Sequence, residues 1–303
     1  MSEADPVNER PKTGAASLLE RAARHFELTP QARVASAGPP MMRAGAAPSA
    51  EAPPAAPVEP RGPSGAIDFD ALRDGGFLVP DMPATGLAEE FRIVKRQLLQ
   101  GAFDAGGVVA GNGNLILVCS AQPGEGKTFC SINLALSLAA ERDLEVLLVD
   151  ADFAKPAVLS TLGLQGGHGL MDALADPARD IETMIISTDL PGLSVLPAGR
   201  HHNDATELLA SQRMQDIVAG LGRVRNRVVI FDSPPALASS AASVLALHVG
   251  QVAMVVNADV TREGQLKDAL SLLSGCPSIQ LLLNRVSFAP GGRRFGAYYG
   301  YGG

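Results

Sequence analysis

Residues 121–128 have the composition and spacing of a loop that binds phosphate groups. They read Ala-Gln-Pro-Gly-Glu-Gly-Lys-Thr, directly after the apolar run 115–119 and directly before a helical pattern. This strand–loop–helix context is the one that such a loop requires. Ala121 stands where the usual pattern has glycine, which is a small departure. The residues therefore predict a nucleotide-binding loop.

Each residue type in this loop has a physical role toward phosphate. Gly124 and Gly126 let backbone N–H groups turn inward, and the N-terminus of the following helix adds the positive end of its dipole. Lys127 supplies a point charge to the β- and γ-oxygens, and Thr128 offers a hydroxyl to Mg²⁺. The predicted nucleotide-binding residues are Gln122, Pro123, Gly124, Glu125, Gly126, Lys127, Thr128 and Phe129, with Asn284 and Arg285 at a later strand end as the adenine contacts.

Three aspartates follow apolar runs farther along the chain. Asp150 and Asp152 end the run 146–149, and Asp232 ends the run 228–231. In doubly wound sheets the ligand lies at the carboxyl ends of the strands, so these carboxylates can converge on the phosphate loop. A carboxylate there is explained by a metal ion or a metal-bound water, although a strand-end aspartate can also cap the next turn. We therefore expect Thr128, Asp150, Asp152 and Asp232 to hold Mg²⁺.

The elements that position these residues alternate between apolar runs and helical patterns. The predicted strands are Leu115–Cys119, Glu145–Val149, Leu193–Leu196, Arg227–Phe231, Gln251–Val256 and Ile279–Leu283. The predicted helices between them include Thr128–Glu141, Ala205–Leu221 and Glu263–Leu273. Strands that are apolar on both faces and separated by helices indicate an α/β fold, namely a doubly wound, mostly parallel sheet with helices on both faces.

The two ends of the chain differ from this central region. Residues 1–65 hold 11 of the 22 prolines, and we expect them to be disordered, with a short amphipathic helix or a frayed segment at 17–26. The predicted nucleotide-binding domain covers 86–288, and 289–303 form a Gly/Tyr-rich tail. This tail carries all three tyrosines of the chain, Tyr298, Tyr299 and Tyr301, at a place where their rings cannot serve the core, so they either have a function or belong to a low-complexity end without one.

A helical pattern before the first central strand carries a charged stripe. Glu89, Arg92 and Lys95 recur every third residue and share one face of that helix. Such a stripe is often only a solvated surface, but it could also pair with another subunit.

Composition excludes several classes of protein. Residues 66–303 carry the whole net charge of −7, which argues against a nucleic-acid-coating surface. No apolar run reaches the roughly 18–20 residues that span a bilayer, and no secretory signal pattern is present, so we expect a cytoplasmic chain. Three cysteines without CxxC spacing do not indicate a disulfide framework or a zinc site.

Together, the phosphate loop, the aspartates, the tyrosine tail and the charged stripe resemble the bacterial tyrosine kinase family, cytoplasmic autokinases of exopolysaccharide and capsule export. The resemblance covers about residues 86–303 and is closest to the exosortase-associated branch, within the MinD/ParA-like P-loop superfamily. Supporting stretches are Leu193–Arg200, Ala205–Arg213 and Leu283–Val286. By this similarity, Lys127 and Thr128 belong to Walker A, Asp150 and Asp152 to Walker A′, and Asp232 to Walker B.

The resemblance implies ATP and Mg²⁺ as cofactors, Lys127, Asp150 and Asp152 as catalytic residues, and Asp150 or Asp152 as the base. It also implies Tyr298, Tyr299 and Tyr301 as the phosphate acceptors. It implies a ring-like homo-oligomer joined through Glu89, Arg92 and Lys95. The implied partners are a membrane chain-length-determinant-like activator, which would recruit the chain to the inner face of the cell membrane, and a phosphotyrosine phosphatase. Two departures are Ala154-Lys155, where the family commonly has an arginine, and Lys95, where it has arginine.

Two other functions fit the same loop. A MinD/ParA-type ATPase switch usually has a second lysine early in the phosphate loop, where this chain has Gln122, and a MinD-like chain would end in an amphipathic membrane helix. A nucleotide-gated, non-catalytic adaptor of a polysaccharide-export complex is the third interpretation, with Ala154 marking lost catalysis.

Overall fold

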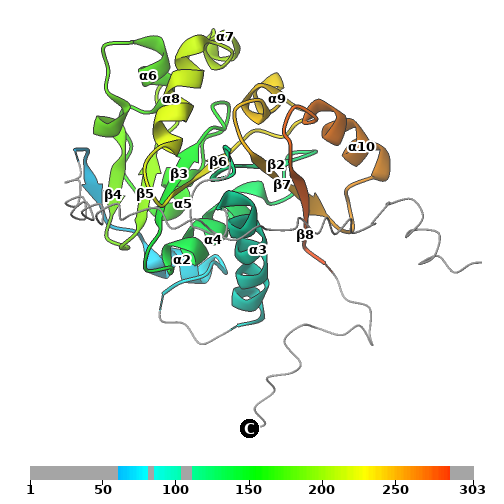
Figure 1. The fold of residues 1–303 in the computed structure, drawn as a ribbon. Coiled ribbons are helices and arrows are strands. Elements are labelled where there is room, and N and C mark those ends of the chain that lie inside the picture. Colours follow the sequence, from blue (N-terminus) through cyan, green and yellow to red (C-terminus); the bar gives the residue numbers. More distant parts are fainter. Residues whose placement is uncertain (1–60, 81–84, 104–110, 287–303) are drawn as a thin grey trace, which may run out of the picture. The chain divides into compact units, whose positions relative to one another are not determined.

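The computed structural model describes residues 61–80, 85–103 and 111–286. In this part of the chain one eight-stranded sheet forms, with the strand order β1-β4-β5-β3-β6-β2-β7-β8 (Figure 1). The strands are β1 (Ser64–Gly65), β2 (Leu115–Ser120), β3 (Glu145–Asp150), β4 (Ile186–Thr188), β5 (Leu193–Leu196), β6 (Arg227–Asp232), β7 (Gln251–Asn257) and β8 (Ile279–Asn284). Neighbouring strands run parallel except β4 and β5, which are antiparallel.

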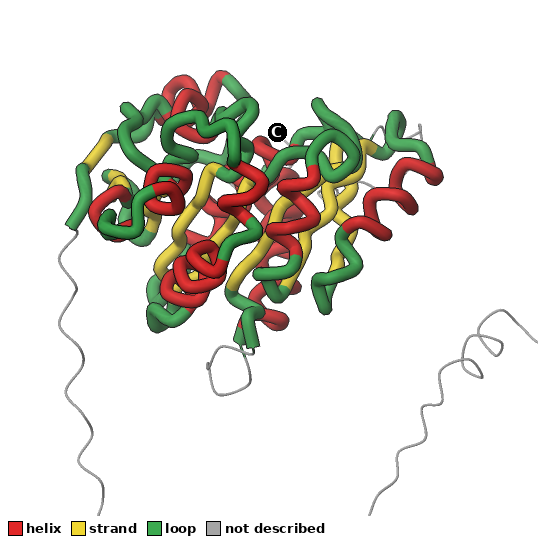
Figure 2. The backbone as a smooth tube through the Cα atoms, turned by 90° about the horizontal axis from the view of Figure 1, so that it is seen from above, coloured by secondary structure: helices red, strands yellow, loops and turns green. Residues whose placement is uncertain are grey.

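Helices cover both faces of this sheet (Figure 2). One face packs against α2 (Phe69–Asp74), α3 (Gly86–Ala102), α4 (Lys127–Ala139) and α5 (Val158–Leu162). The other packs against α6 (Leu170–Ala175), the 3₁₀ helix η1 (Ile181–Met184), α7 (Ala205–Leu209), α8 (Gln212–Gly222), α9 (Ser240–Ala246) and α10 (Glu263–Leu272). The predicted doubly wound α/β fold is therefore confirmed.

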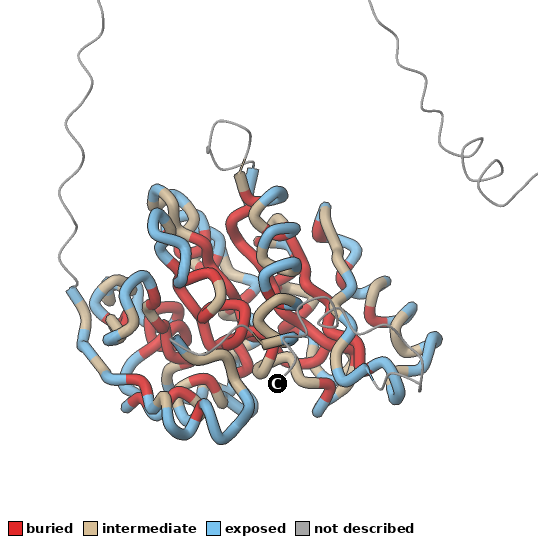
Figure 3. Tube along the Cα trace, turned by 90° about the horizontal axis from the view of Figure 1, so that it is seen from below, coloured by how far each residue is buried: buried red, intermediate tan, exposed pale blue. Residues whose placement is uncertain are grey.

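The central strands are buried along almost their whole length (Figure 3). Every residue of β2 and β7 is buried, and β3 and β6 are buried after their first residues. Two helix layers exclude water from both faces of these strands, which is why they read as continuous apolar runs. All six predicted strands are present, and each ends at most one residue later than expected.

Parallel packing of β3, β6 and β2 brings three loops to one edge of the sheet. Asp150 at the end of β3 lies opposite Asp232 at the end of β6, and Asp232 lies opposite Val118 of β2. The phosphate loop leaves β2 two residues after Val118. The carboxyl edge of the sheet therefore collects the residues that the sequence singles out.

Two expectations about the elements were wrong. The predicted helix Ala205–Leu221 is two helices, α7 and α8, because the Ser211 side chain accepts a hydrogen bond from the Met214 amide and starts a new helix there. The described domain also begins before Gly86. Residues 61–80 pack onto it, with Leu72 fully buried against α5 and its neighbours and the Phe77 ring 4.8 Å from that of Phe129.

Several predicted features lie outside the described residues. They are the segment 1–60 with its candidate helix 17–26, and the tail 287–303 with Tyr298, Tyr299 and Tyr301. Of the predicted disordered region 1–65, the structure describes 61–65, where Ser64–Gly65 pair with β4 as a short strand. Among the described helices, none is both long and apolar enough to cross a membrane.

Candidate functional site

The loop between β2 and α4 has the backbone of a phosphate cradle. Gly124 and Gly126 have φ values of +81° and +97°, a region that favours glycine. Gly126 is the N-cap of α4, so the amides of the first helical turn face the loop. A Cβ atom at Gly126 would lie 2.2 Å from Nδ2 of Asn284, so a larger residue there would displace the end of β8.

Lys127 lies among carboxylates. Its Nζ donates to Oδ2 of Asp152 at 2.7 Å, and both side chains are largely buried. Burial alone would lower the pKa of Lys127, but the charges of Asp232, Asp152 and Asp150 outweigh it and raise that pKa above its usual value. The lysine is therefore a permanent cation beside the loop, held by Asp152 until an anion competes for it.

Asp232 is fully buried beneath the start of α4. Its Oδ2 accepts from the hydroxyl of Thr128 at 2.7 Å, and its Oδ1 accepts from that of Ser131 at 2.9 Å. Burial raises the pKa of Asp232, although Lys127 and the two hydroxyls act in the opposite direction. Asp232 thus orients Thr128, whose hydroxyl is the predicted metal ligand in the loop.

Asp150 is 1% exposed and faces a different set of groups. Its Oδ2 accepts from the Val158 amide at 3.0 Å, and its Oδ1 accepts from the Asp152 amide at 3.3 Å. Burial raises its pKa to about 7, and the charge of Asp232 adds to that shift. Asp150 therefore has the pKa of a group that exchanges a proton near neutral pH.

Glu125 ties the loop to the ends of two other strands. Its buried carboxylate accepts from the Gln122 amide at 2.9 Å and from the Thr261 hydroxyl. Its backbone carbonyl accepts from Nδ2 of Asn284 at 2.9 Å. Asn284, which the sequence predicts as an adenine contact, therefore holds the loop in this structure, and Arg285 follows it with a φ of +54°.

The donor set allows a test of whether a magnesium ion fits here. Among the residues that the structure describes, no group of three His, Cys, Asp or Glu side chains could hold a metal ion alone. Mg²⁺ commonly uses one or two carboxylates and takes its other ligands from substrate phosphates and water. Thr128 and Asp232 supply hard oxygen donors in contact with each other, directly beside the phosphate loop. The residues fit a metal that arrives with a nucleotide.

The charged stripe is not uniform in the structure. Arg92 pairs with Glu89 on its own helix, and both side chains are partly exposed. Lys95, in contrast, is only 12% exposed and donates to the Ser137 carbonyl at 2.8 Å and to Glu141 at 2.7 Å. Lys95 therefore fastens α3 to the end of α4 within the same chain, which separates it from the exposed pair Glu89 and Arg92.

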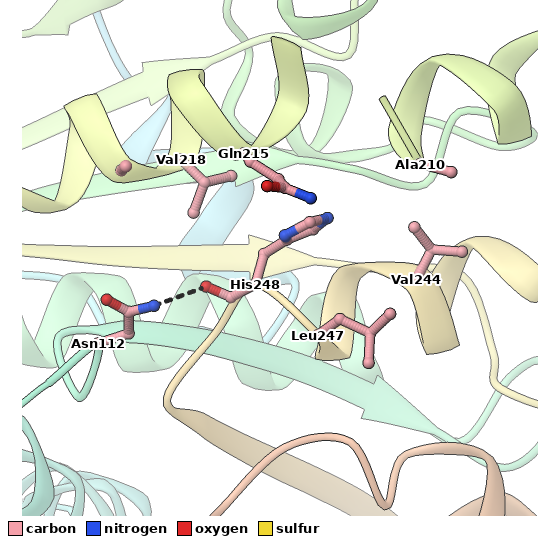
Figure 4. A pocket seen from close by; sticks show the side chains of 8 residues that line it. Asn112, Ala210, Gln215, Val218, Val244, Leu247 and His248 are labelled. Atoms are coloured by element: carbon pink, nitrogen blue, oxygen red, sulfur yellow. Dashed lines mark hydrogen bonds between the residues drawn. The ribbon is translucent and has the colours of Figure 1, made fainter. Parts of the chain in front are cut away.

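A separate hollow of about 470 Å³ lies between α8 and α9. In Figure 4 the imidazole of His248 points toward the side chain of Gln215. Its buried Nε2 has no hydrogen-bond partner among the described residues, and burial lowers the pKa of His248. The hollow borders Asn112, just before β2, so it lies at the opposite edge of the sheet from the phosphate loop and contains no residue predicted to bind nucleotide.

Sequence reasoning missed two residues that support this site. Ser131 stands four positions after Lys127, one helical turn along α4, and this spacing alone could have indicated it. Thr261 lies 136 residues from Glu125 and carries no local signal, so only the packing of β7 beside β2 reveals it.

Comparison with known proteins agrees with this geometry. Residues 113–266 match the AAA domain family. The chain is 32% identical over 195 residues to EpsB of Ralstonia nicotianae, named as a candidate tyrosine-protein kinase, over 64% of this chain and 24% of EpsB. It is 31% identical over 163 residues to the tyrosine-protein kinase YwqD of Bacillus subtilis, over 54% of this chain and 68% of YwqD.

A solved structure also resembles this chain in fold. The crystal structure of the VpsO kinase domain matches with a TM-score of 0.56 and 29% identity, over 66% of this chain and 95% of that domain. The match to EpsB spans about a quarter of that protein, whereas the match to the VpsO kinase domain spans nearly all of it.

Proposed function

Because the chain belongs to the family of bacterial tyrosine-protein kinases, with its AAA domain at residues 113–266, we propose that it is an ATP-dependent protein-tyrosine autokinase. The observation that supports this most is the meeting of the phosphate loop with three aspartates at one edge of the sheet. Lys127 contacts Asp152, Thr128 contacts Asp232, and Asp150 lies opposite Asp232 in the neighbouring strand.

ATP would bind with its phosphates in the loop 122–128. The triphosphate competes with Asp152 for Lys127, because its β- and γ-oxygens carry more negative charge than one carboxylate. Backbone amides of the first turn of α4 face the same phosphates. The proposed adenine contacts are Asn284, which ends β8 and contacts the loop, and Arg285, which follows it.

Mg²⁺ would be held by Thr128 and Asp232, with Asp150 and Asp152 close by. When bound, it neutralises charge on the β- and γ-phosphates during transfer. The residues of this chain then have two tasks. Lys127 orients the γ-phosphate, and Asp232 fixes the hydroxyl of Thr128 toward the loop.

The transfer itself needs a group that accepts the phenol proton. A tyrosine hydroxyl has an unperturbed pKa of about 10, so it is neutral when it attacks. The bond from the phenol oxygen to the γ-phosphorus forms, the bond from that phosphorus to the β–γ bridging oxygen breaks, and ADP leaves with the electron pair. The phenol proton passes to a carboxylate. Asp150 suits this role better than Asp152, because Asp152 is paired with Lys127 and burial raises the pKa of Asp150 to about 7.

The proposed acceptors are Tyr298, Tyr299 and Tyr301, and the proposed transfer runs between subunits. The 15 residues from Ala289 onward can extend on the order of 50 Å at ~3.3 Å per residue, enough to reach a neighbouring subunit. Each phosphate adds about −1.5 to −2 charge, so a modified tail is repelled by the three aspartates and leaves the site. Phosphorylation would thus cycle a homo-oligomer between associated and dispersed states.

In the cell, this cycle would regulate exopolysaccharide synthesis or export. A membrane activator resembling a chain-length determinant would recruit the kinase to the inner face of the membrane, and a phosphotyrosine phosphatase would reset it. The exposed pair Glu89 and Arg92 is the proposed contact between subunits, with Lys95 supporting it from within α3.

Mixing two variants tests the proposal. A Lys127→Met chain keeps its tyrosines but cannot transfer phosphate, and a chain with all three tyrosines replaced by phenylalanine can transfer but not accept. Phosphotyrosine on the Lys127→Met chain of the mixture is the expected result, while each variant alone stays unlabelled. If neither chain is labelled in the mixture although the parent protein is, transfer between subunits is refuted.

A further inference from the structure

Glu125 lies in the middle of the phosphate loop but turns its side chain away from solvent. It is 2% exposed, between two glycines whose positive φ values shape the loop. A buried carboxylate at this place repels the phosphate groups that the loop is proposed to bind. Its charge therefore opposes nucleotide binding, so any benefit of Glu125 must come from the contacts that it makes.

Both carboxylate oxygens of Glu125 accept hydrogen bonds. Oε2 accepts from the Gln122 amide at 2.9 Å, which closes the loop on itself. Oε1 accepts from the Thr261 hydroxyl, and Oγ1 of that hydroxyl accepts from the Asn257 amide at 3.0 Å. Both groups that face the carboxylate are thus donors. A glutamine side chain would leave one of them without an acceptor, because its amide nitrogen only donates.

Thr261 is itself fixed at the end of β7. In the turn between β7 and α10, its amide donates to the Asn257 carbonyl at 2.9 Å. Asn257 is buried and lies opposite Asn284 of β8, whose Nδ2 donates to the Glu125 carbonyl at 2.9 Å. In the sheet, β7 is the neighbour of β2, and β8 follows β7 (Figure 1). Glu125 is therefore held through its side chain from the end of β7 and through its backbone from the end of β8.

From these contacts we infer that Thr261 is a positioning residue for the nucleotide. Its hydroxyl holds Glu125, and through it the Gln122 amide, so that the loop keeps the shape that receives phosphate. The inference rests on the proposed function, because it takes this loop to be the ATP site of the kinase. A loop that adopts the receiving shape for only a fraction of the time binds nucleotide more weakly by that fraction.

Two substitutions break the contact between Thr261 and Glu125 and keep the charge. Thr261→Val has nearly the shape of threonine but no hydroxyl, and it leaves the Glu125 carboxylate in place. Glu125→Asp keeps a carboxylate on a side chain that is shorter by one methylene group, so it no longer spans the distance to both Thr261 and Gln122. Thr261→Ser retains the hydroxyl and serves as the conservative variant.

Thr188→Val is the matched control for the loss of a hydroxyl. Thr188 ends β4, toward the other end of the sheet, and is partly buried like Thr261. Its hydroxyl donates to the Leu193 carbonyl at 2.8 Å and accepts from the Leu190 amide at 3.2 Å. Thr188→Val therefore removes a hydroxyl that both donates and accepts, as Thr261→Val does, but away from the phosphate loop.

Titration calorimetry of the full chain with ADP and Mg²⁺ measures the affinity directly. We expect Thr261→Val and Glu125→Asp each to raise the dissociation constant for ADP by about five- to tenfold, and the KM for ATP in autophosphorylation by a similar factor. The kcat should stay within about twofold of the parent value, because at saturating ATP the bound nucleotide holds the loop. Thr261→Ser and Thr188→Val should bind ADP within about twofold of the parent, although Thr188→Val lowers the midpoint of urea unfolding as Thr261→Val does.

A double variant shows whether the two residues act through one contact. Each single change already breaks that contact, so combining Thr261→Val with Glu125→Asp should weaken ADP binding by no more than about twofold beyond the weaker-binding single variant. A dissociation constant that multiplies the two single effects would mean that the residues act separately, and this overturns the inference.

The other outcomes separate the role of Thr261 from the kinase function. Affinity of Thr261→Val for ADP within about twofold of the parent overturns the inference, and so does an equal loss of affinity in Thr261→Val and Thr188→Val, which would reflect stability alone. If Thr261→Val does not fold, Glu125→Asp decides in the same assay. If the parent binds ADP but forms no phosphotyrosine with ATP, the kinase function is refuted, while the ADP titrations still decide the role of Thr261.

Discussion

Replacing Asp150 with asparagine is expected to change how the stability of the nucleotide-free protein depends on pH. Burial raises the pKa of Asp150 from an ordinary 3.8 to about 7 in the folded protein. Between these two values the folded state binds a proton that the unfolded state has released. The stability that comes from this proton is fully present below the unfolded pKa and is lost as the pH rises through the folded pKa.

The size of the effect follows from these pKa values. For a group that titrates near 3.8 when unfolded and near 7 when folded, the contribution to the free energy of unfolding falls by about 2–3 kcal/mol between pH 5 and pH 8. Asparagine does not titrate, so the variant lacks this loss. The cost of weakening the hydrogen bonds from the Val158 and Asp152 amides is the same at both pH values and cancels in the comparison.

Urea unfolding at pH 5 and at pH 8, followed by circular dichroism, measures this difference. From pH 5 to pH 8 the unfolding free energy of Asp150→Asn should rise relative to the parent by about 2–3 kcal/mol. The control is Asp268→Asn, at an exposed position on α10, which should follow the parent. If Asp150→Asn and the parent change in parallel with pH, Asp150 is not a buried group with a raised pKa, and its role as proton acceptor loses its physical basis.

Three further outcomes are expected. Lys127→Met should abolish phosphotyrosine formation and leave the far-ultraviolet circular dichroism spectrum unchanged. The control Lys267→Met, at an exposed position on α10, should keep its kinase activity. Equal phosphotyrosine in Lys127→Met and in the parent at saturating ATP would contradict this. Removing residues 1–60 should leave autophosphorylation unchanged. Removing residues 1–80 should lower the unfolding free energy by at least about 2–3 kcal/mol, because Leu72 and its neighbours leave the core. Equal thermal stability of the two truncated proteins would disprove that packing. Lys95→Met should lower the unfolding free energy by about 0.5–1 kcal/mol, measured in urea, through loss of its bonds to α4, and an unchanged value would show that these bonds contribute nothing.

The parts of this fold that follow from sequence are those set by local pattern. The runs 115–119 and 227–231 are apolar at every position except the first residue of the second, which indicates buried strands, and Gly124 and Gly126 of the phosphate loop adopt left-handed conformations that glycine permits without strain. Strand β4 was missed because Ile186–Thr188 is short and part of it is only half-buried, which leaves no long apolar run. The break between α7 and α8 was missed because the capping hydroxyl of Ser211 competes with an otherwise continuous helical pattern.

The features of the site also divide into those that follow from local pattern and those that depend on packing. The convergence of Asp150, Asp152 and Asp232 could be predicted, because it depends only on parallel strands ending at one edge. The inward position of Lys95 could not, since its partners Ser137 on α4 and Glu141 just after α4 lie 42 and 46 residues away and depend on how two helices pack. The contact between Glu125 and Thr261 is equally nonlocal. Residues fixed by the chain direction of a strand can be predicted, whereas side-chain partners between packed elements require the structure.

The most direct test of the account is to incubate the purified full chain with γ-labelled ATP and Mg²⁺ and to identify where the label goes. The account predicts phosphotyrosine at Tyr298, Tyr299 and Tyr301 in the parent protein and none in Lys127→Met. Free phosphate without phosphotyrosine would instead indicate an ATPase switch, and nucleotide binding without turnover would indicate a non-catalytic adaptor. Either of those two results would contradict the claim that this chain is a tyrosine autokinase.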